Sequence, residues 1–163
     1  METYRSDDAE ETTMQNSTLH PNLTVTDARA AIDYYVAAFG AEVIDEITAG
    51  ETIIHSDLTL GGSTFTVAAA FAGSSVAPDP AGFVPVSFTV NLSSADDVDA
   101  TFARAVAAGA TAVAEPADWF EGFRQSELRC PFGHRWFFVH VAPEITAADV
   151  QRASDAWMAT DAS

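Results

Sequence analysis

The sequence contains no lysine and has only seven arginines, against 24 aspartates and glutamates in 163 residues. The formal net charge is −17 at pH 7. A surface this acidic repels nucleic acid and anionic membranes, because both carry negative charge themselves. The same charge can attract a cationic ligand or simply favour solubility, and it does not decide between the two.

Cysteine is equally scarce, since Cys130 is the only one. A single thiol excludes an intramolecular disulfide and any zinc site built from several cysteines. No base is evident next to Cys130, so we interpret it as a small buried residue rather than a nucleophile. Phosphate loops, nucleophile elbows and dinucleotide fingerprints are absent as well.

Long apolar runs are also missing. The first residues are polar and acidic, which predicts neither a signal peptide nor a membrane-spanning helix, and the cytoplasm is the expected location. The 48% hydrophobic content nevertheless suits a globular protein with a substantial core.

What the sequence does contain is an internal repeat of a β-α-β-β-β unit. The first copy predicts a strand at 19–25, a helix that starts at a cap on Thr26 or Asp27 and ends at Gly40, and strands at 41–47, 52–60 and 63–71. Gly61 and Gly62 mark a hairpin turn between the last two strands. Ile32, Tyr35, Val36 and Phe39 form the predicted apolar stripe of the helix.

The second copy follows a linker at 72–82 that is rich in glycine, serine and proline. It predicts a strand at 84–92, a helix capped by Ser94 with Asp97 and closed by Gly109, and strands at 111–114, 122–129 and 135–141. A short helix at 146–158 should present Ile145, Val150, Ala153 and Trp157 on its apolar side. We therefore expect an α+β fold in which a disordered acidic tail, 1–18, precedes modules 19–79 and 80–142 and a C-terminal segment, 143–163.

Three motifs resemble the vicinal-oxygen-chelate superfamily, which includes glyoxalase I, bleomycin- and fosfomycin-resistance proteins and extradiol dioxygenases. They are HPNLTVTD at His20–Asp27, AAIDYYVAAFG at Ala30–Gly40 and PFGHRW at Pro131–Trp136, and they occur within the duplicated unit. The resemblance covers residues 19 to 142. It implies two modules that wrap a half-open β-cleft, often at a homodimer interface.

Metal-using members of that superfamily take four ligands from the first and last strands of the two modules. By resemblance these positions fall on His20, Thr66, Pro85 and Phe137. Only His20 ligates strongly, and one imidazole does not hold a divalent metal against water. We therefore expect no metal centre of the family type and no other cofactor.

Strand alternation assigns side chains to the cleft once His20 and Phe137 are placed on it. In the first module Ile54, Ser56 and Leu58 then face the core, whereas His55 and Asp57 face the cleft. A register error of one residue would reverse each assignment. The predicted cleft residues are His20, Asn22, Thr24, His55, Asp57, Thr64, Thr66, Ser87, Thr89, Phe123, Gln125, Glu127, Arg135, Phe137 and Val139.

Two carboxylates, Asp57 and Glu127, occupy matching positions in the two modules. Such a pair can act as acid and base if an apolar cleft separates their pKa values, with His55 as a further base. Alternatively, both are strand residues paired with Arg135 or water. Trp119 and Phe120 are expected on a loop, where they either stack on a planar ligand or plug the core.

These observations favour a homodimeric, metal-independent protein that binds a planar or cationic small molecule. Trp119, Phe120 and Phe137 would stack on the ligand, and Asp57 and Glu127 would meet its positive charge. The alternative is a metal-independent isomerase or lyase for a small oxygenated substrate, with His55, Asp57 or Glu127 as base. A metal-dependent lyase or dioxygenase is a third possibility, with His20, His55 and Glu127 as ligands.

Overall fold

The computed structural model describes residues 18–161, so the predicted acidic tail lies outside the described residues apart from its last position. No helix within residues 18–161 is long and apolar enough to cross a membrane.

The first module builds one sheet with the strand order β1-β5-β4-β2. Strand β3 pairs with the first residues of β4, from Thr52 to His55. Strand β1 runs parallel to β5, whereas β4 and β5 form an antiparallel hairpin. The predicted turn at Gly61 and Gly62 is confirmed. The elements are β1 (Asn22–Val25), α1 (Ala28–Tyr34), the π-helix η2 (Tyr35–Phe39), β2 (Glu42–Val43), β3 (Ile47–Ala49), β4 (Thr52–Leu60) and β5 (Ser63–Ala69).

The second module repeats this topology with the strand order β6-β9-β8-β7. Its first strand, β6, again runs parallel to its last, β9. The predicted internal repeat and the α+β fold are therefore confirmed in the pairing of the strands. The elements are β6 (Ser87–Asn91), α2 (Ala95–Ala107), β7 (Thr111–Phe120), β8 (Phe123–Arg129) and β9 (Arg135–Val141).

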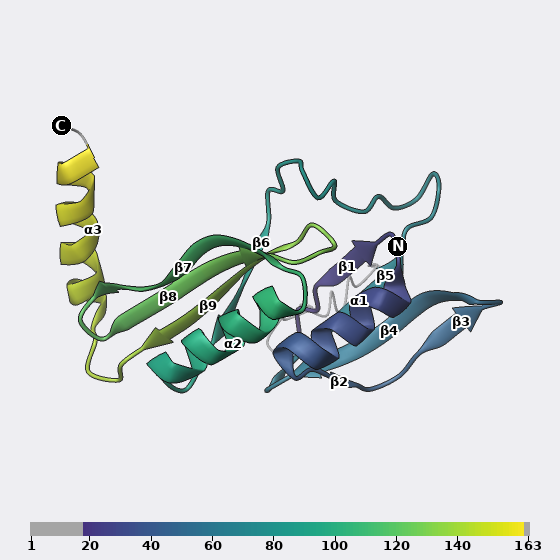
Figure 1. The fold of residues 1–163 in the computed structure, drawn as a ribbon, viewed down its shortest axis with the longest axis horizontal. Coiled ribbons are helices and arrows are strands. Elements are labelled where there is room, and N and C mark those ends of the chain that lie inside the picture. The colour runs from purple at the N-terminus through teal and green to yellow at the C-terminus, as the bar shows by residue number, and fades with distance from the viewer. Residues whose placement is uncertain (1–17, 162–163) are drawn as a thin grey trace, which may run out of the picture.

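The two modules lie side by side, and α1 and α2 cover the same side of the molecule (Figure 1). Helix α1 starts because the Asp27 side chain accepts a hydrogen bond from the Ala30 N–H at 3.0 Å. Ser94 caps α2 as predicted, since its Oγ accepts from the Asp97 N–H at 3.1 Å. Gly40 takes the left-handed conformation, at a φ of 74°, that lets the chain leave η2 and turn into the next strand.

The prediction that Val36 belongs to the buried stripe is wrong, because its exposed fraction is 42%. The chain widens from an α-helix into a π-helix at Tyr35, and the buried face then centres on Tyr35 and Ala38. Val36 is left at the edge of that face.

Aromatic side chains from both modules form one core. The Trp136 ring of β9 lies 4.9 Å from Phe39, 5.5 Å from Tyr35 and 6.0 Å from Phe65, measured between ring centroids. Tyr35 is fully buried, and its hydroxyl lies 3.5 Å from the sulfur of Cys130. The aromatic stretch after Gly133 thus joins the second sheet to the helix of the first module.

Two further predictions need correction. Leu19, which alternation over the predicted strand 19–25 puts on the same side as Leu23 and Val25, has an exposed fraction of 93%, because β1 begins only at Asn22. Trp119 and Phe120 end β7 rather than occupying a loop, because this strand runs on to the hairpin at Gly122.

The C-terminal helix α3 (Ala147–Asp161) stands at the far end of the second sheet and points away from it (Figure 1). Trp157, predicted on its apolar side, is 54% exposed. The described part of this chain therefore offers no cover for that residue.

Candidate functional site

Each sheet has one face against the helices and one open face. On the first sheet, Asp57 pairs with Thr66 and Asn22 also pairs with Thr66, which places these three side chains on the open face. On the second sheet, Glu127 pairs with Phe137 and Gln125 with Val139, again on the open face. These side chains therefore lie on the face of each sheet that is turned away from the helices.

One assignment on β4 is wrong. Ile54 was expected in the core, but Ile53 is the buried residue there, and burial then resumes at Ser56. The pairing of β3 with β4 shifts register between Ile47 and Thr48, which breaks strict alternation at this point.

A polar cluster lies on the open face of the first sheet. His55 Nε2 lies 3.2 Å from Asp57 Oδ1, and the same oxygen accepts a hydrogen bond from Thr66 Oγ1 at 2.5 Å. The Thr66 hydrogen bond lowers the pKa of Asp57, and His55 and His20 act in the same direction. Asp57 is therefore held as an anion.

Sequence reasoning missed one member of this cluster, Asp45, in the loop between β2 and β3. Its Oδ1 accepts from the Asp57 N–H at 3.1 Å, and its carbonyl oxygen accepts from Ser56 Oγ at 2.7 Å. Asp45 was predicted within a strand at 41–47, but this segment forms β2, a loop at 44–46 and β3, and a loop residue shows no alternation. The available signal was the acidic pair Asp45 and Glu46, one short strand before the strand that carries His55 and Asp57.

A second polar cluster lies on the open face of the second sheet. Arg135 Nε donates to Glu127 Oε1 at 2.7 Å, and its guanidinium carbon stands 5.7 Å from the centre of the Phe137 ring. The Glu127 side chain is only 13% exposed. Arg135 therefore balances the charge of Glu127. This agrees with the alternative given from the sequence, that Glu127 is a strand residue paired with Arg135.

These clusters stay separate, since within residues 18–161 no hydrogen bond or ion pair joins Asp57 to Glu127. Each carboxylate is held by partners in its own sheet, so the chain does not assemble them into one acid–base pair. Trp119 and Phe120 belong to neither cluster and instead pack against Phe123, with centroids 5.3 and 5.5 Å from its ring.

The four family metal positions offer little to a metal here. His20 is exposed, Thr66 is buried and bonded to Asp57, and Pro85 and Phe137 have no ligand atom in their side chains. These residues do not fit a metal centre of the family type.

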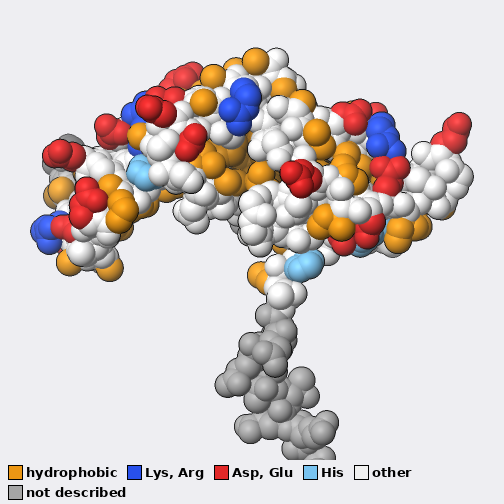
Figure 2. Space-filling model, turned by 90° about the horizontal axis from the view of Figure 1, so that it is seen from below, with side chains coloured by type: hydrophobic (Ala, Val, Ile, Leu, Met, Phe, Trp, Pro, Cys, Tyr) orange, Lys and Arg blue, Asp and Glu red, His pale blue; other side chains and the backbone are white. Residues whose placement is uncertain are grey.

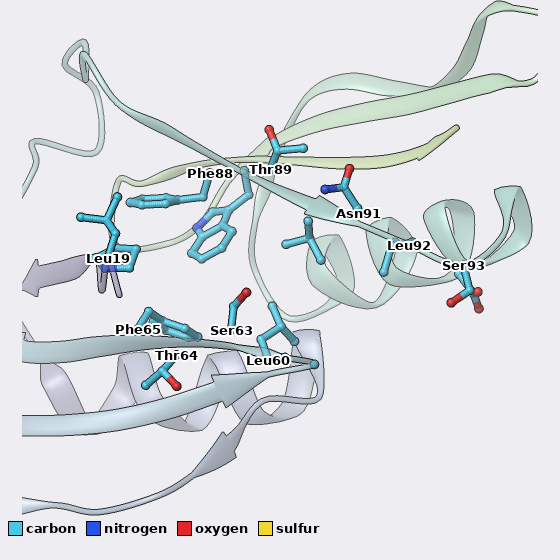
Figure 3. A pocket seen from close by; sticks show the side chains of 16 residues that line it. Leu19, Leu60, Ser63, Thr64, Phe65, Phe88, Thr89, Asn91, Leu92 and Ser93 are labelled. Atoms are coloured by element: carbon cyan, nitrogen blue, oxygen red, sulfur yellow. The ribbon is translucent and has the colours of Figure 1, made fainter. Parts of the chain in front are cut away.

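A cavity of about 570 Å³ lies at the seam between the modules, and we call it the seam cavity. Figure 2 shows apolar side chains gathered at a hollow between the two halves of the molecule. In Figure 3, Leu60, Ser63 and Phe65 face Leu19 and Phe88 across this space, whereas Thr64 points away from it. The other lining residues are Pro21, Gly61, Gly62, Thr64, Thr89, Val90, Asn91, Leu92, Ser93, Asp97 and Trp136.

The seam cavity has the size and character of a small-molecule site, because such sites enclose roughly 300–1,000 Å³ and are mostly apolar with a few polar groups. Asp97 is its only charged lining residue among those described. Thr64 and Thr89, which strand alternation assigned to the cleft, line it, but none of the predicted ligand-binding residues does. That set, His20, Asn22, His55, Asp57, Gln125, Glu127, Arg135 and Phe137, stays a prediction, as do Trp119 and Phe120.

A smaller cavity of about 240 Å³ lies under the linker and is lined by Asn22, Thr24, Pro85 and His134, among others. Burial, with a smaller contribution from Arg129, lowers the pKa of His134 to about 4. His134 is therefore a neutral imidazole at physiological pH.

Two sheets of this topology, lying side by side, define an α+β fold with two repeated modules. The model of the Glyoxalase/Bleomycin resistance protein/Dioxygenase superfamily matches residues 17–138, and the chain belongs to this superfamily. The match ends before α3, so this helix lies outside the family pattern.

Proteins from other organisms are similar to this chain in sequence or in fold. An uncharacterized protein of Mycobacterium bovis, Mb0911c, is 35% identical over 140 residues, which cover 83% of this chain and 90% of the relative. The crystal structure of TioX from Micromonospora sp. ML1 is 33% identical, with a TM-score of 0.59, and the match covers 76% of this chain and 98% of TioX. A glyoxylase/bleomycin resistance protein/dioxygenase domain from Frankia sp. EAN1pec shares the fold at 16% identity, with a TM-score of 0.64 and coverage of 78% and 93%.

Proposed function

We propose that this protein binds a planar, preferably cationic, small molecule in the seam cavity. The observation that carries the proposal is the aromatic lining by Phe65, Phe88 and Trp136, in a cavity whose one charged lining residue among those described is Asp97. Aromatic faces stack on flat ligands and attract cations, and a carboxylate at the rim adds to that attraction. The net charge of −17 favours the same class of ligand.

Binding is favoured over acid–base catalysis because the two cleft carboxylates are engaged separately. A general base and its partner acid must reach one substrate together, and Asp57 and Glu127 belong to different sheets. Neither lines the seam cavity. The homodimer expected from the family remains part of the proposal, and light scattering of the purified chain tests it.

The test is a titration with a phenanthridinium cation and with its uncharged analogue, followed by calorimetry. Ser63→Phe places a ring in the cavity and should raise the Kd for both compounds at least about tenfold. Thr48→Phe is the matched control, because it adds the same ring at an exposed strand residue that does not line the cavity. Equal affinities in these two variants, or no binding to the native chain, would overturn the proposal.

A matched pair of variants tests whether the cavity prefers a cation. Asp97→Asn should weaken binding of the cation about two- to fivefold and leave the uncharged analogue unaffected, as expected for one exposed charge. Asp96→Asn removes a neighbouring carboxylate of the same helix turn that does not line the cavity, and it should change neither affinity.

One observation supports the alternative, a metal-independent isomerase or lyase. His55 and Asp57 lie 3.2 Å apart, an arrangement in which a carboxylate orients an imidazole for proton transfer. Turnover of a small oxygenated substrate that is abolished in His55→Ala, with binding kept, would favour this function over ligand binding alone.

A further inference from the structure

We propose that Asp45, His55 and Asp57 form a divalent transition-metal site on the first sheet, apart from the seam cavity. The potential ligand atoms of these three residues all lie within 4.8 Å of one another. The site is distinct from the family metal position, because it lies within one module and uses β4 and the loop before β3. It does not rest on the proposed ligand-binding function.

The distances are close to those of a formed site. Ligand atoms that share a metal at 2.0–2.2 Å are separated by at most about 4.4 Å. Atoms within 4.8 Å of one another therefore need only small side-chain rotations to reach a common ion.

The backbone and Thr66 orient the two carboxylates. The Asp57 N–H holds Oδ1 of Asp45, and Thr66 holds Oδ1 of Asp57. Within residues 18–161 the second oxygen of each carboxylate takes part in no hydrogen bond, so each is available to a metal. Outer partners of this kind fix ligand orientation in known metal sites.

Burial and composition point to the class of ion. The side chains of His55 and Asp57 are 39% and 24% exposed, which leaves room for water or substrate at the open coordination positions. One imidazole with two carboxylates suits Zn²⁺, Mn²⁺, Fe²⁺ or Co²⁺ better than Ca²⁺ or Mg²⁺, which prefer oxygen alone.

The chain supplies three ligands, because His20, a family metal position, is not among the clustered residues. The excess of negative charge over the whole chain also favours a cation at this place.

The experiment uses the full chain without a histidine tag, stripped with a chelator and dialysed. Titration with Co²⁺, followed by its visible absorption and by calorimetry, should give one site per chain. Asp45→Asn and His55→Ala should each raise the Kd at least about tenfold, since losing even an outer partner costs ten- to hundredfold. Asp45→Asn keeps an oxygen that can accept from the Asp57 N–H, so it preserves the local fold.

Glu127→Gln is the matched control, because it removes a carboxylate from the open face of the other sheet. It should leave the Co²⁺ affinity unchanged. Several weak sites per chain, or an equal loss in all three variants, would show diffuse binding to the acidic surface and would overturn the proposal. Ser63→Phe should not alter Co²⁺ binding, so failure of the seam-cavity ligand and failure of the metal site are distinguishable.

Discussion

The rings of Phe39 and Trp136, one from each module, lie 4.9 Å apart and nearly perpendicular, with an interplanar angle of 80°. This edge-to-face contact lies in the core that joins the two modules. Trp136→Ala should reduce the free energy of unfolding by about 3–5 kcal/mol, measured by urea denaturation. Trp157→Ala is the control, because the same substitution at an exposed site should cost less than about 0.5 kcal/mol. Similar losses in both would contradict the role of Trp136.

A second prediction concerns the turn after Cys130, where Gly133 has a φ of +90° and the linker crosses it. A Cβ added at Gly133 would stand 2.9 Å from the Cβ of Pro78. Gly50, with a φ of +64° and open space around it, serves as the control. Gly50→Ala should cost about 1–2 kcal/mol for backbone strain alone, and Gly133→Ala about 1–3 kcal/mol more for the clash.

A double-mutant cycle separates the two costs of Gly133→Ala. Adding Pro78→Gly removes the obstructing Cβ and should restore the part that is due to the clash. If the losses of Gly133→Ala and Pro78→Gly simply add, the linker does not pack on this turn.

A third prediction follows from His134. Its folded-state pKa, about 4, lies below the usual 6.5, so the unfolded chain takes up the proton first on acidification. Stability that is fully present above about pH 6.5 is therefore lost as the pH falls towards 4, by on the order of 1–2 kcal/mol after allowance for partial exposure. An NMR titration of the His134 ring with a midpoint near 6.5 would refute this.

A fourth prediction concerns the start of α2. Ser94→Ala removes the cap on the Asp97 N–H and should destabilise the protein by about 1 kcal/mol. Ser93→Ala, one residue earlier and exposed, should have little effect on the free energy of unfolding. Equal effects in thermal denaturation would mean that the cap contributes nothing.

Local signals in the sequence predicted the fold well. Strand β4 was predicted with its observed bounds, and Ser94 was identified as a cap, because alternation and capping depend on neighbouring residues only. Long-range effects account for the errors. The π-helix exposes Val36, and the hairpin at Gly122 draws Trp119 and Phe120 into β7. The boundaries of the modules stay predictions.

The candidate site was less accessible to sequence reasoning. Alternation placed Asp57 and Glu127 on open faces, but it carries no information on how far apart the two sheets stand. The seam cavity lies between the start of β5 and strand β6, whose lining side chains come from both faces. Asp45 joins His55 and Asp57 through a loop, which follows no period.

Cys130 is buried beneath Tyr35, so its reactivity reports on the opening of the core between the modules. Cys130 is the only thiol in the chain. Because it is buried, it reacts with a thiol reagent only when the inter-module core opens. The labelling rate of the unmodified protein therefore measures the frequency of that opening, and a compound that binds in the seam cavity should slow it.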